Sequence, residues 1–116
     1  MLSPKELTVL LSILNEEEKS MEAVSMQFQR AFSKQDHFKV GCCIYLMLKD
    51  GLLGKVTNRL SAYYILFDLY KTEPLTSNPF LPIFVDTLKK DLEPLERNFL
   101  VQLITNPPKE VITFLK

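Results

Sequence analysis

The single histidine, His37, is the residue around which a nucleophilic site of this chain would have to be built. A serine or cysteine nucleophile needs an adjacent base, and His37 lies beside Asp36 where a helix is expected to start. The sequence contains no HExxH or GxSxG motif, no glycine-rich phosphate loop and no spaced set of metal ligands. We therefore expect no enzyme, cofactor or metal site, and we interpret His37 as a solvated or capping-turn residue rather than the centre of a hydrolase.

The two cysteines, Cys42 and Cys43, are adjacent within an apolar run. Neighbouring side chains on a helix point about 100° apart, so this pair cannot form an ordinary disulfide or supply the spaced ligands of a zinc site. We expect both thiols to be free and to lie in or near the core, which agrees with a reducing compartment.

Three other groups of residues have a purely structural interpretation as well as a functional one. The run 16–18 consists of glutamates in a turn, where a solvated surface is expected. Asp68 could pair with a basic residue of a partner, although a lone acid on the wet edge of a helix is favoured. The segment 51–54 has the GxxG spacing of an RNA-clamping loop, but the strands of such a fold are missing, so an interhelical turn is favoured.

Charge and hydropathy exclude further classes of protein. The 14 basic and 14 acidic residues cancel, so the chain lacks the basic footprint of a nucleic-acid-binding protein. The longest apolar stretches are under half of the roughly 20 residues that cross a bilayer, and the N-terminus lacks the order of a signal peptide. We expect a cytoplasmic protein, with the nucleus as a second location. An accessory RNA-binding surface is the alternative function, and it would need these side chains to converge: Lys5, Lys34, Lys39, Arg59 and Lys71.

The elements that position these residues are predicted to be helices. A hydrophobic fraction of 47% over 116 residues suits one packed core, so we expect a single helical domain over 1–116. No segment shows the strict alternation of a half-buried strand. We predict an all-α fold of six or seven short helices packed as antiparallel pairs, as a bundle or solenoid-like array. The helices are expected at about 4–15, 21–33, 37–49, 57–71, 79–88, 94–104 and, for a short seventh, from about 110 onward.

Local signals mark several of these helices. Ser3 and Glu6 form a capping box around Pro4, and Ser20 can cap the second helix. Asp36 is expected to cap the third helix with its side chain, and Asp50-Gly51 to end it. The third helix is apolar nearly all round, which predicts a central helix covered on several sides. Some of the three tyrosines of the fourth helix are expected at the edge of the core. In the sixth helix the expected core positions include Leu95, Phe99 and Leu100.

The segment 72–84 is a stiff apolar elbow. Pro74, Pro79 and Pro82 restrict the chain, while Leu75 and Phe80 are among the residues that supply more apolar area than a linker needs. A stiff segment loses little conformational entropy when it docks, so the elbow suits partner binding. From the residues alone, an elbow whose side chains return to the core is favoured, and the segment 106–110 has the same two interpretations.

Five blocks of residues occur in order over almost the whole chain and resemble a known family. The blocks are Ser3-Pro-Lys-Glu-Leu7 with Leu10-Leu-Ser-Ile13; Phe32-Ser-Lys with Asp36-His-Phe38; Arg59-Leu60 with Ala62-Tyr63; Thr72-Glu-Pro-Leu75 with Asn78-Pro-Phe80; and Phe99-Leu100, Gln102-Leu103 and Pro107-Pro108. Together they are similar to the N-terminal domain of the eleventh subunit of the CCR-NOT mRNA deadenylase complex. The block from Thr72 to Phe80 is the most specific of them.

The resemblance implies a non-catalytic subunit that docks on the scaffold (first) subunit and on the helical-repeat tenth subunit. It implies a role in mRNA deadenylation, mRNA turnover and translational repression, with no membrane, small-molecule or direct nucleic-acid partner. Relatives in animals carry a low-complexity leader, a proline-rich insertion and a C-terminal domain that are absent here, so we interpret the chain as a fragment or a compact form. The candidate partner-binding residues are Tyr63, Tyr70, Glu73, Pro74, Leu75, Asn78, Pro79, Phe80, Pro107 and Pro108.

Overall fold

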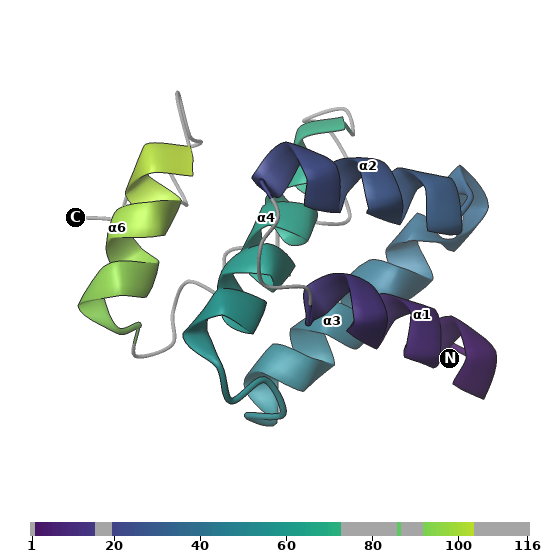
Figure 1. Ribbon diagram of the computed structural model, residues 1–116, viewed down its shortest axis with the longest axis horizontal. Coiled ribbons are helices and arrows are strands. Elements are labelled where there is room, and N and C mark those ends of the chain that lie inside the picture. The colour runs from purple at the N-terminus through teal and green to yellow at the C-terminus, as the bar shows by residue number, and fades with distance from the viewer. Residues whose placement is uncertain (1, 16–19, 73–85, 87–91, 104–116) are drawn as a thin grey trace.

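The computed structural model describes residues 2–15, 20–72, 86 and 92–103, and these residues are helical wherever they form regular structure (Figure 1). The helices are α1 (Pro4–Leu14), α2 (Met21–Ala31), the 3₁₀ turn η1 (Lys34–Asp36), α3 (His37–Lys49), α4 (Val56–Thr72) and α6 (Pro94–Leu103). The all-α prediction is therefore confirmed. Within the described residues there are five α-helices where six or seven were predicted, and the predicted segments near 79–88 and after 110 lie outside the described residues apart from Asp86.

The first two helices begin at the predicted caps. The Ser3 hydroxyl accepts from the Glu6 backbone N–H at 3.2 Å, and the Glu6 carboxylate accepts from the Ser3 N–H at 3.0 Å, which completes the capping box. The hydrogen bond from the Ser3 backbone holds the pKa of Glu6 below its ordinary value, because it favours the charged carboxylate. Ser20 caps α2 by accepting from the Ala23 N–H at 3.2 Å.

The predicted side-chain cap at Asp36 is wrong. Asp36 itself has a helical backbone, with φ of −93° and ψ of −5°, because the 3₁₀ turn η1 leads directly into α3. A capping residue needs an extended backbone to aim its oxygen at the helix N–H groups. The Asp36 carboxylate instead accepts from the Ser33 hydroxyl at 3.2 Å and lies 3.7 Å from the Lys39 ammonium.

The end of α3 matches the predicted Asp50-Gly51 stop. Gly51 has a φ of +70°, a left-handed conformation that favours glycine. Its N–H donates to the Leu48 carbonyl at 3.3 Å, and the Leu52 N–H donates to the Met47 carbonyl at 2.9 Å. These two bonds form a Schellman motif, so the segment 51–54 is an interhelical turn.

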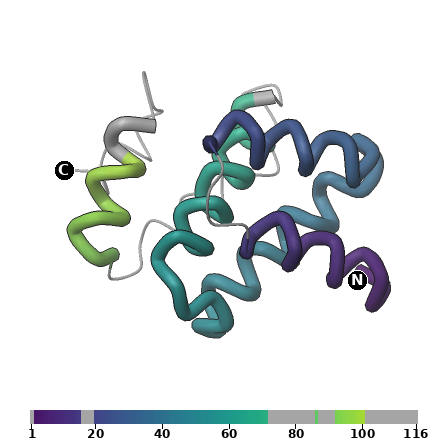
Figure 2. The backbone as a smooth tube through the Cα atoms, viewed as in Figure 1, coloured from purple at the N-terminus to yellow at the C-terminus, as the bar shows by residue number. Residues whose placement is uncertain are grey.

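The central helix is α4 and not α3. It packs against α1, α2, α3 and α6, and Figures 1 and 2 show it between α6 on one side and the other helices on the other. Its core positions include Ile65 and Leu66, which are fully buried. The expected central position of α3 is wrong. Its expected cover on several sides stays a prediction, because the Tyr45 hydroxyl, outside the buried face, donates to the Asp86 carboxylate. The buried residues of α3 are Val40, Gly41, Ile44, Met47 and Leu48, which share one face at helical spacing.

The orientation of α6 differs from the prediction by one residue. Leu100 is fully buried and Phe99 packs against the core, as expected. Leu95, however, is exposed, whereas Glu96 is buried at 4% exposure. The helix is rotated so that Glu96 faces α4, where two polar partners satisfy its carboxylate.

Candidate protein-docking site

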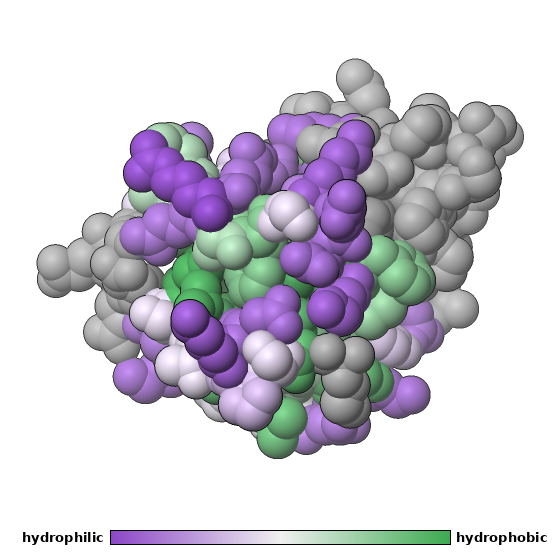
Figure 3. Space-filling view, turned by 90° about the vertical axis from the view of Figure 1, so that its right-hand side faces the viewer, coloured by the Kyte–Doolittle hydropathy of each residue, from purple (hydrophilic) through white to green (hydrophobic). Residues whose placement is uncertain are grey.

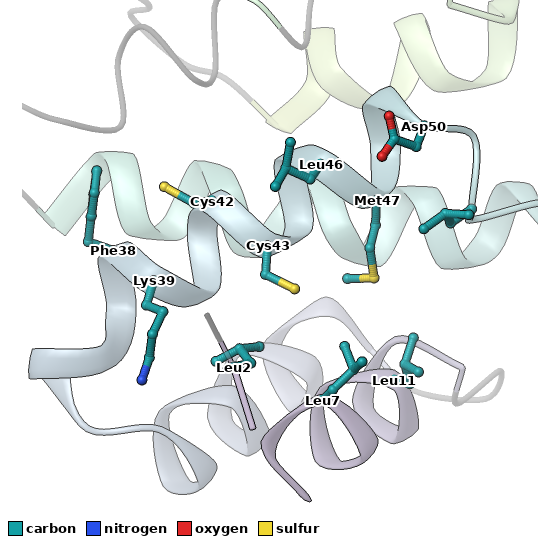
Figure 4. A pocket seen from close by; sticks show the side chains of 11 residues that line it. Leu2, Leu7, Leu11, Phe38, Lys39, Cys42, Cys43, Leu46, Met47 and Asp50 are labelled. Atoms are coloured by element: carbon teal, nitrogen blue, oxygen red, sulfur yellow. The ribbon is translucent and has the colours of Figure 1, made fainter. Parts of the chain in front are cut away.

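An apolar groove lies between α1 and α3 and has a volume of about 750 Å³ (Figure 4). Of its lining side chains, only Lys39 and Asp50 are charged. The lining residues are Leu2, Leu7, Leu11, Phe38, Lys39, Cys42, Cys43, Leu46, Met47, Asp50 and Leu52. We call this surface the α1–α3 groove.

Helical spacing builds the α3 side of the groove from two rows of side chains. Phe38, Cys42 and Leu46 are four residues apart, and they form the outer row in Figure 4. Lys39, Cys43 and Met47 form the second row, which points toward Leu7 and Leu11 of α1 in the same view. The second row and α1 thus enclose the inner part of the groove, while the outer row extends it.

Several apolar side chains of the groove are partly exposed to solvent. Phe38 is 51% exposed and Leu46 is 45% exposed, and Leu52 at the turn is also exposed. The side of the molecule on which the N-terminus lies shows hydrophobic surface between hydrophilic side chains (Figure 3). Contiguous apolar surface of this kind, rimmed by polar residues, is typical of sites that bind other molecules.

The two charged residues of the groove lie at opposite ends of α3. Near the start, the Lys39 ammonium lies 3.7 Å from Asp36 and 4.0 Å from Glu6. Asp50 lies at the C-terminal end of the helix and forms no ion pair with another described residue. The negative end of the helix dipole is at the same place, so a cation is favoured there.

The free thiols of Cys42 and Cys43 are half-buried in the groove. Burial raises the pKa of both thiols, because the thiolate loses solvation. The expected position near the core is confirmed for Cys43, which packs against it, while Cys42 belongs to the outer row.

A buried polar network joins α4 to α6 on the opposite side of α4 from the groove helices. The Glu96 carboxylate accepts from Arg59 Nε at 2.9 Å and from the Tyr63 hydroxyl at 2.5 Å. Arg59 also donates to the carbonyls of Leu53 and Gly54 at 3.0 and 2.9 Å. Burial, and then the hydrogen bond to Glu96, raises the pKa of Tyr63 well above its ordinary range.

This network was missed by the sequence analysis, although one signal for it exists. Arg59 and Tyr63 are four residues apart, so they lie on one face of α4 and can share a carboxylate from a neighbouring helix. Tyr63 and Tyr70 were candidate partner-binding residues at the edge of the core, and both are buried here. Their role in binding stays a prediction.

Asp68 is largely buried and is hydrogen-bonded within the fold. Its carboxylate accepts from the Ser25 hydroxyl at 2.7 Å and from the Gln29 amide at 3.2 Å, and it lies 3.8 Å from the Lys71 ammonium. The expected position on the wet edge of a helix is therefore wrong, because α2 packs over this side of α4 and supplies hydrogen-bond donors.

His37 is the first residue of α3, directly after the turn η1. One ring nitrogen is 3.3 Å from the Phe32 carbonyl, and the ring centroid is 5.1 Å from that of Phe28. Within the described ranges, no group of three His, Cys, Asp or Glu side chains could hold a metal ion. In the same part of the chain no helix is long and apolar enough to cross a membrane.

The basic side chains of the RNA-binding alternative do not form one patch along α4. Arg59 and Lys71 are twelve residues apart on this helix, a rise of about 18 Å. Arg59 is also held by Glu96 and by two carbonyls, and Lys39 by two carboxylates. The remaining candidate partner-binding residues, Glu73 to Phe80, Pro107 and Pro108, and the run 16–18 lie outside the described residues.

The fold and this groove define an all-α domain with an open apolar surface between two helices. Residues 22–94 match the family described as the CNOT11 N-terminal domain. The chain belongs to this family, which confirms the resemblance seen in the sequence. α1 precedes the matched segment, and α6 begins where that segment ends.

A relative from Dictyostelium discoideum named "CCR4-NOT transcription complex subunit 11" is 49% identical over 80 residues. The match covers 67% of this chain and 12% of the relative, so the chain corresponds to a small part of that protein.

Proposed function

We propose that this chain is a non-catalytic protein-interaction module of a CCR4-NOT complex. Family membership supports a subunit role, since the relative is named as a subunit of that complex. The observation that carries the proposal is the α1–α3 groove, with Phe38 and Leu46 exposed beside free thiols. Burying such side chains against a partner removes apolar area from water, which is the main driving force of most protein association.

The proposed partners are the scaffold (first) subunit and the tenth subunit, as the resemblance implies. In this role the module supports mRNA deadenylation, and with it mRNA turnover and translational repression, in the cytoplasm and also in the nucleus. The elbow of residues 72–80 is a second proposed contact. Aromatic and aliphatic anchors at the centre of an interface contribute most of its binding energy, so one charge at such an anchor should be decisive.

Co-purification with a matched control tests this proposal. The tagged chain is expressed in cells, and recovery of the first and tenth subunits is quantified by mass spectrometry. Leu46→Asp is expected to lower recovery about tenfold or more. Met26→Asp is the control, because Met26 on α2 is 52% exposed, close to the 45% of Leu46. This substitution should leave recovery of the subunits unchanged. Circular dichroism verifies that both variants keep their helices.

Two results would contradict the proposal. One is failure of the unmodified chain to recover either subunit. The other is equal recovery by Leu46→Asp and the unmodified chain, which would remove the groove from the interface.

A further inference from the structure

No described helix packs over the α1–α3 groove, and we propose that an amphipathic α-helix of a partner subunit fills it and places a Lys or Arg side chain against Asp50. This inference rests on the proposed function, because it names the chemistry of the partner at that site. It specifies both the secondary structure and the charge of the occupant.

The shape of the groove favours a helix. Helices pack by inserting a row of side chains into the groove between two rows of the neighbouring helix, and rows four residues apart are the most common contact. Two rows of the groove have this spacing of four residues. One is Phe38, Cys42 and Leu46 on α3, and the other is Leu7 and Leu11 on α1. They lie on either side of a floor that includes Cys43 and Met47, so a third helix can seat one row of its side chains between them.

The length of the groove sets the length of the occupant. From Phe38 to Asp50 the helix rises about 18 Å, which a partner helix covers in about twelve residues. Three or four apolar side chains at helical spacing fit this distance. A partner strand would need a free sheet edge to pair with, and the described ranges contain no strand.

The charges of the groove favour a basic side chain at one end. At the start of α3, the Lys39 ammonium is already shared by Glu6 and Asp36 and adds no unbalanced positive charge. At the other end, the Asp50 carboxylate and the C-terminal carbonyls of α3 are both negative. A Lys or Arg there gains from the carboxylate and from the helix dipole together.

Charge reversal combined with photo-crosslinking tests the inference in the tagged full chain expressed in cells. Asp50→Lys is expected to lower recovery of the partner subunits about tenfold, and Asp50→Asn by a smaller factor that shrinks as salt is added. Glu22→Lys, an exposed reversal on α2, is the matched control and should leave recovery unchanged. A photo-crosslinking residue at position 46 should capture an amphipathic helical segment that carries a Lys or Arg at one end of its apolar stripe.

The outcomes separate this inference from the proposed function. If the unmodified chain recovers the subunits and Asp50→Lys recovers them equally well, the basic helix is excluded while the subunit role stands. A crosslink to a second copy of this chain, to another segment of the same chain or to a non-helical segment also overturns the inference. If the unmodified chain recovers neither subunit, the proposed function fails and the inference fails with it.

Discussion

α3 and α4 are both apolar over most of their surface, yet the fold treats them differently. α4 is covered by four helices, and its residues Ile65 and Leu66 have almost no exposed surface. Among the described residues, α3 is buried on one face, and Phe38 and Leu46 are about half exposed. The comparison shows that an apolar helix surface can have two different roles in one domain. α4 packs in the core, whereas part of the apolar surface of α3 lines an open groove. The following predictions test that division, beginning with the largest expected effect.

A Leu→Ala substitution on each helix should show the difference between α3 and α4 most clearly in the free energy of unfolding. Leu66→Ala removes a side chain that is 1% exposed, so it is expected to lower the free energy of unfolding by about 3 kcal/mol. Leu46→Ala removes a side chain that is 45% exposed and should change it by less than about 0.5 kcal/mol. Urea unfolding followed by circular dichroism measures both. Similar losses for the two variants would show that Leu46 belongs to the core.

Removal of the Glu96 carboxylate should affect only the α4 side of the molecule. Glu96→Ala leaves the Arg59 guanidinium and the Tyr63 hydroxyl without their shared acceptor, at an expected cost of about 2 kcal/mol in unfolding free energy. Glu93→Ala is the control, because Glu93 is exposed and lies 3.7 Å from Arg59; its effect should stay below about 0.5 kcal/mol. Equal effects of the two variants in urea unfolding would rule out a buried network.

The cap of α1 tests the stability of the groove wall. Ser3→Ala removes the hydroxyl that accepts from the Glu6 N–H and is expected to lower the free energy of unfolding by about 1 kcal/mol. Ser12→Ala, at an exposed position inside α1, should be neutral within about 0.5 kcal/mol. Chemical denaturation compares the two variants. No difference between them would mean that α1 does not fold together with the core.

The ionisation of Tyr63 should have the smallest effect on the free energy of unfolding at neutral pH, and a clear effect at alkaline pH. Burial and the bond to Glu96 raise its pKa above the ordinary value of 10.0, so the folded state holds the proton more tightly than the unfolded state. The stability that this provides is present below pH 10.0 and is lost as the pH rises above it. The hydrogen bond to Asp86 also raises the pKa of Tyr45, and burial raises that of Tyr64, so ultraviolet absorbance of the four tyrosines should show a latest step that Tyr63→Phe removes. Ordinary ionisation of all four would place Tyr63 at the surface.

Most features set by residues close in the sequence could be predicted, the Asp36 cap excepted, and features set by distant contacts could not. The Ser3 capping box and the Gly51 stop depend on residues within one turn of each other, and both were predicted correctly. The all-round apolar pattern of α3 could not reveal how many helices would cover it. Asp68 was misjudged and Glu96 was missed, because their hydrogen-bond donors come from α2 and α4, far away in the chain.

The candidate site, too, could be predicted only in part. The sequence placed Cys42 and Cys43 near the core, but it did not indicate that both thiols line a groove against α1. The family could be inferred from short blocks of residues in the sequence. That inference did not require any knowledge of the contacts that these residues make in the fold. The groove itself requires the relative position of two helices that are more than twenty residues apart in the chain.

The two native thiols provide the most direct test of the central claim, which is that a partner covers the α1–α3 groove. Cys42 and Cys43 are the two cysteines of the chain, so their alkylation by N-ethylmaleimide reports on this surface alone. The rates are measured by mass spectrometry at one mildly alkaline pH, for the tagged chain alone and for the complex that it recovers from cells, with Cys42→Ser to separate the two thiols. The account predicts that alkylation in the complex is at least about tenfold slower. Equal rates in the free chain and in the complex would contradict it.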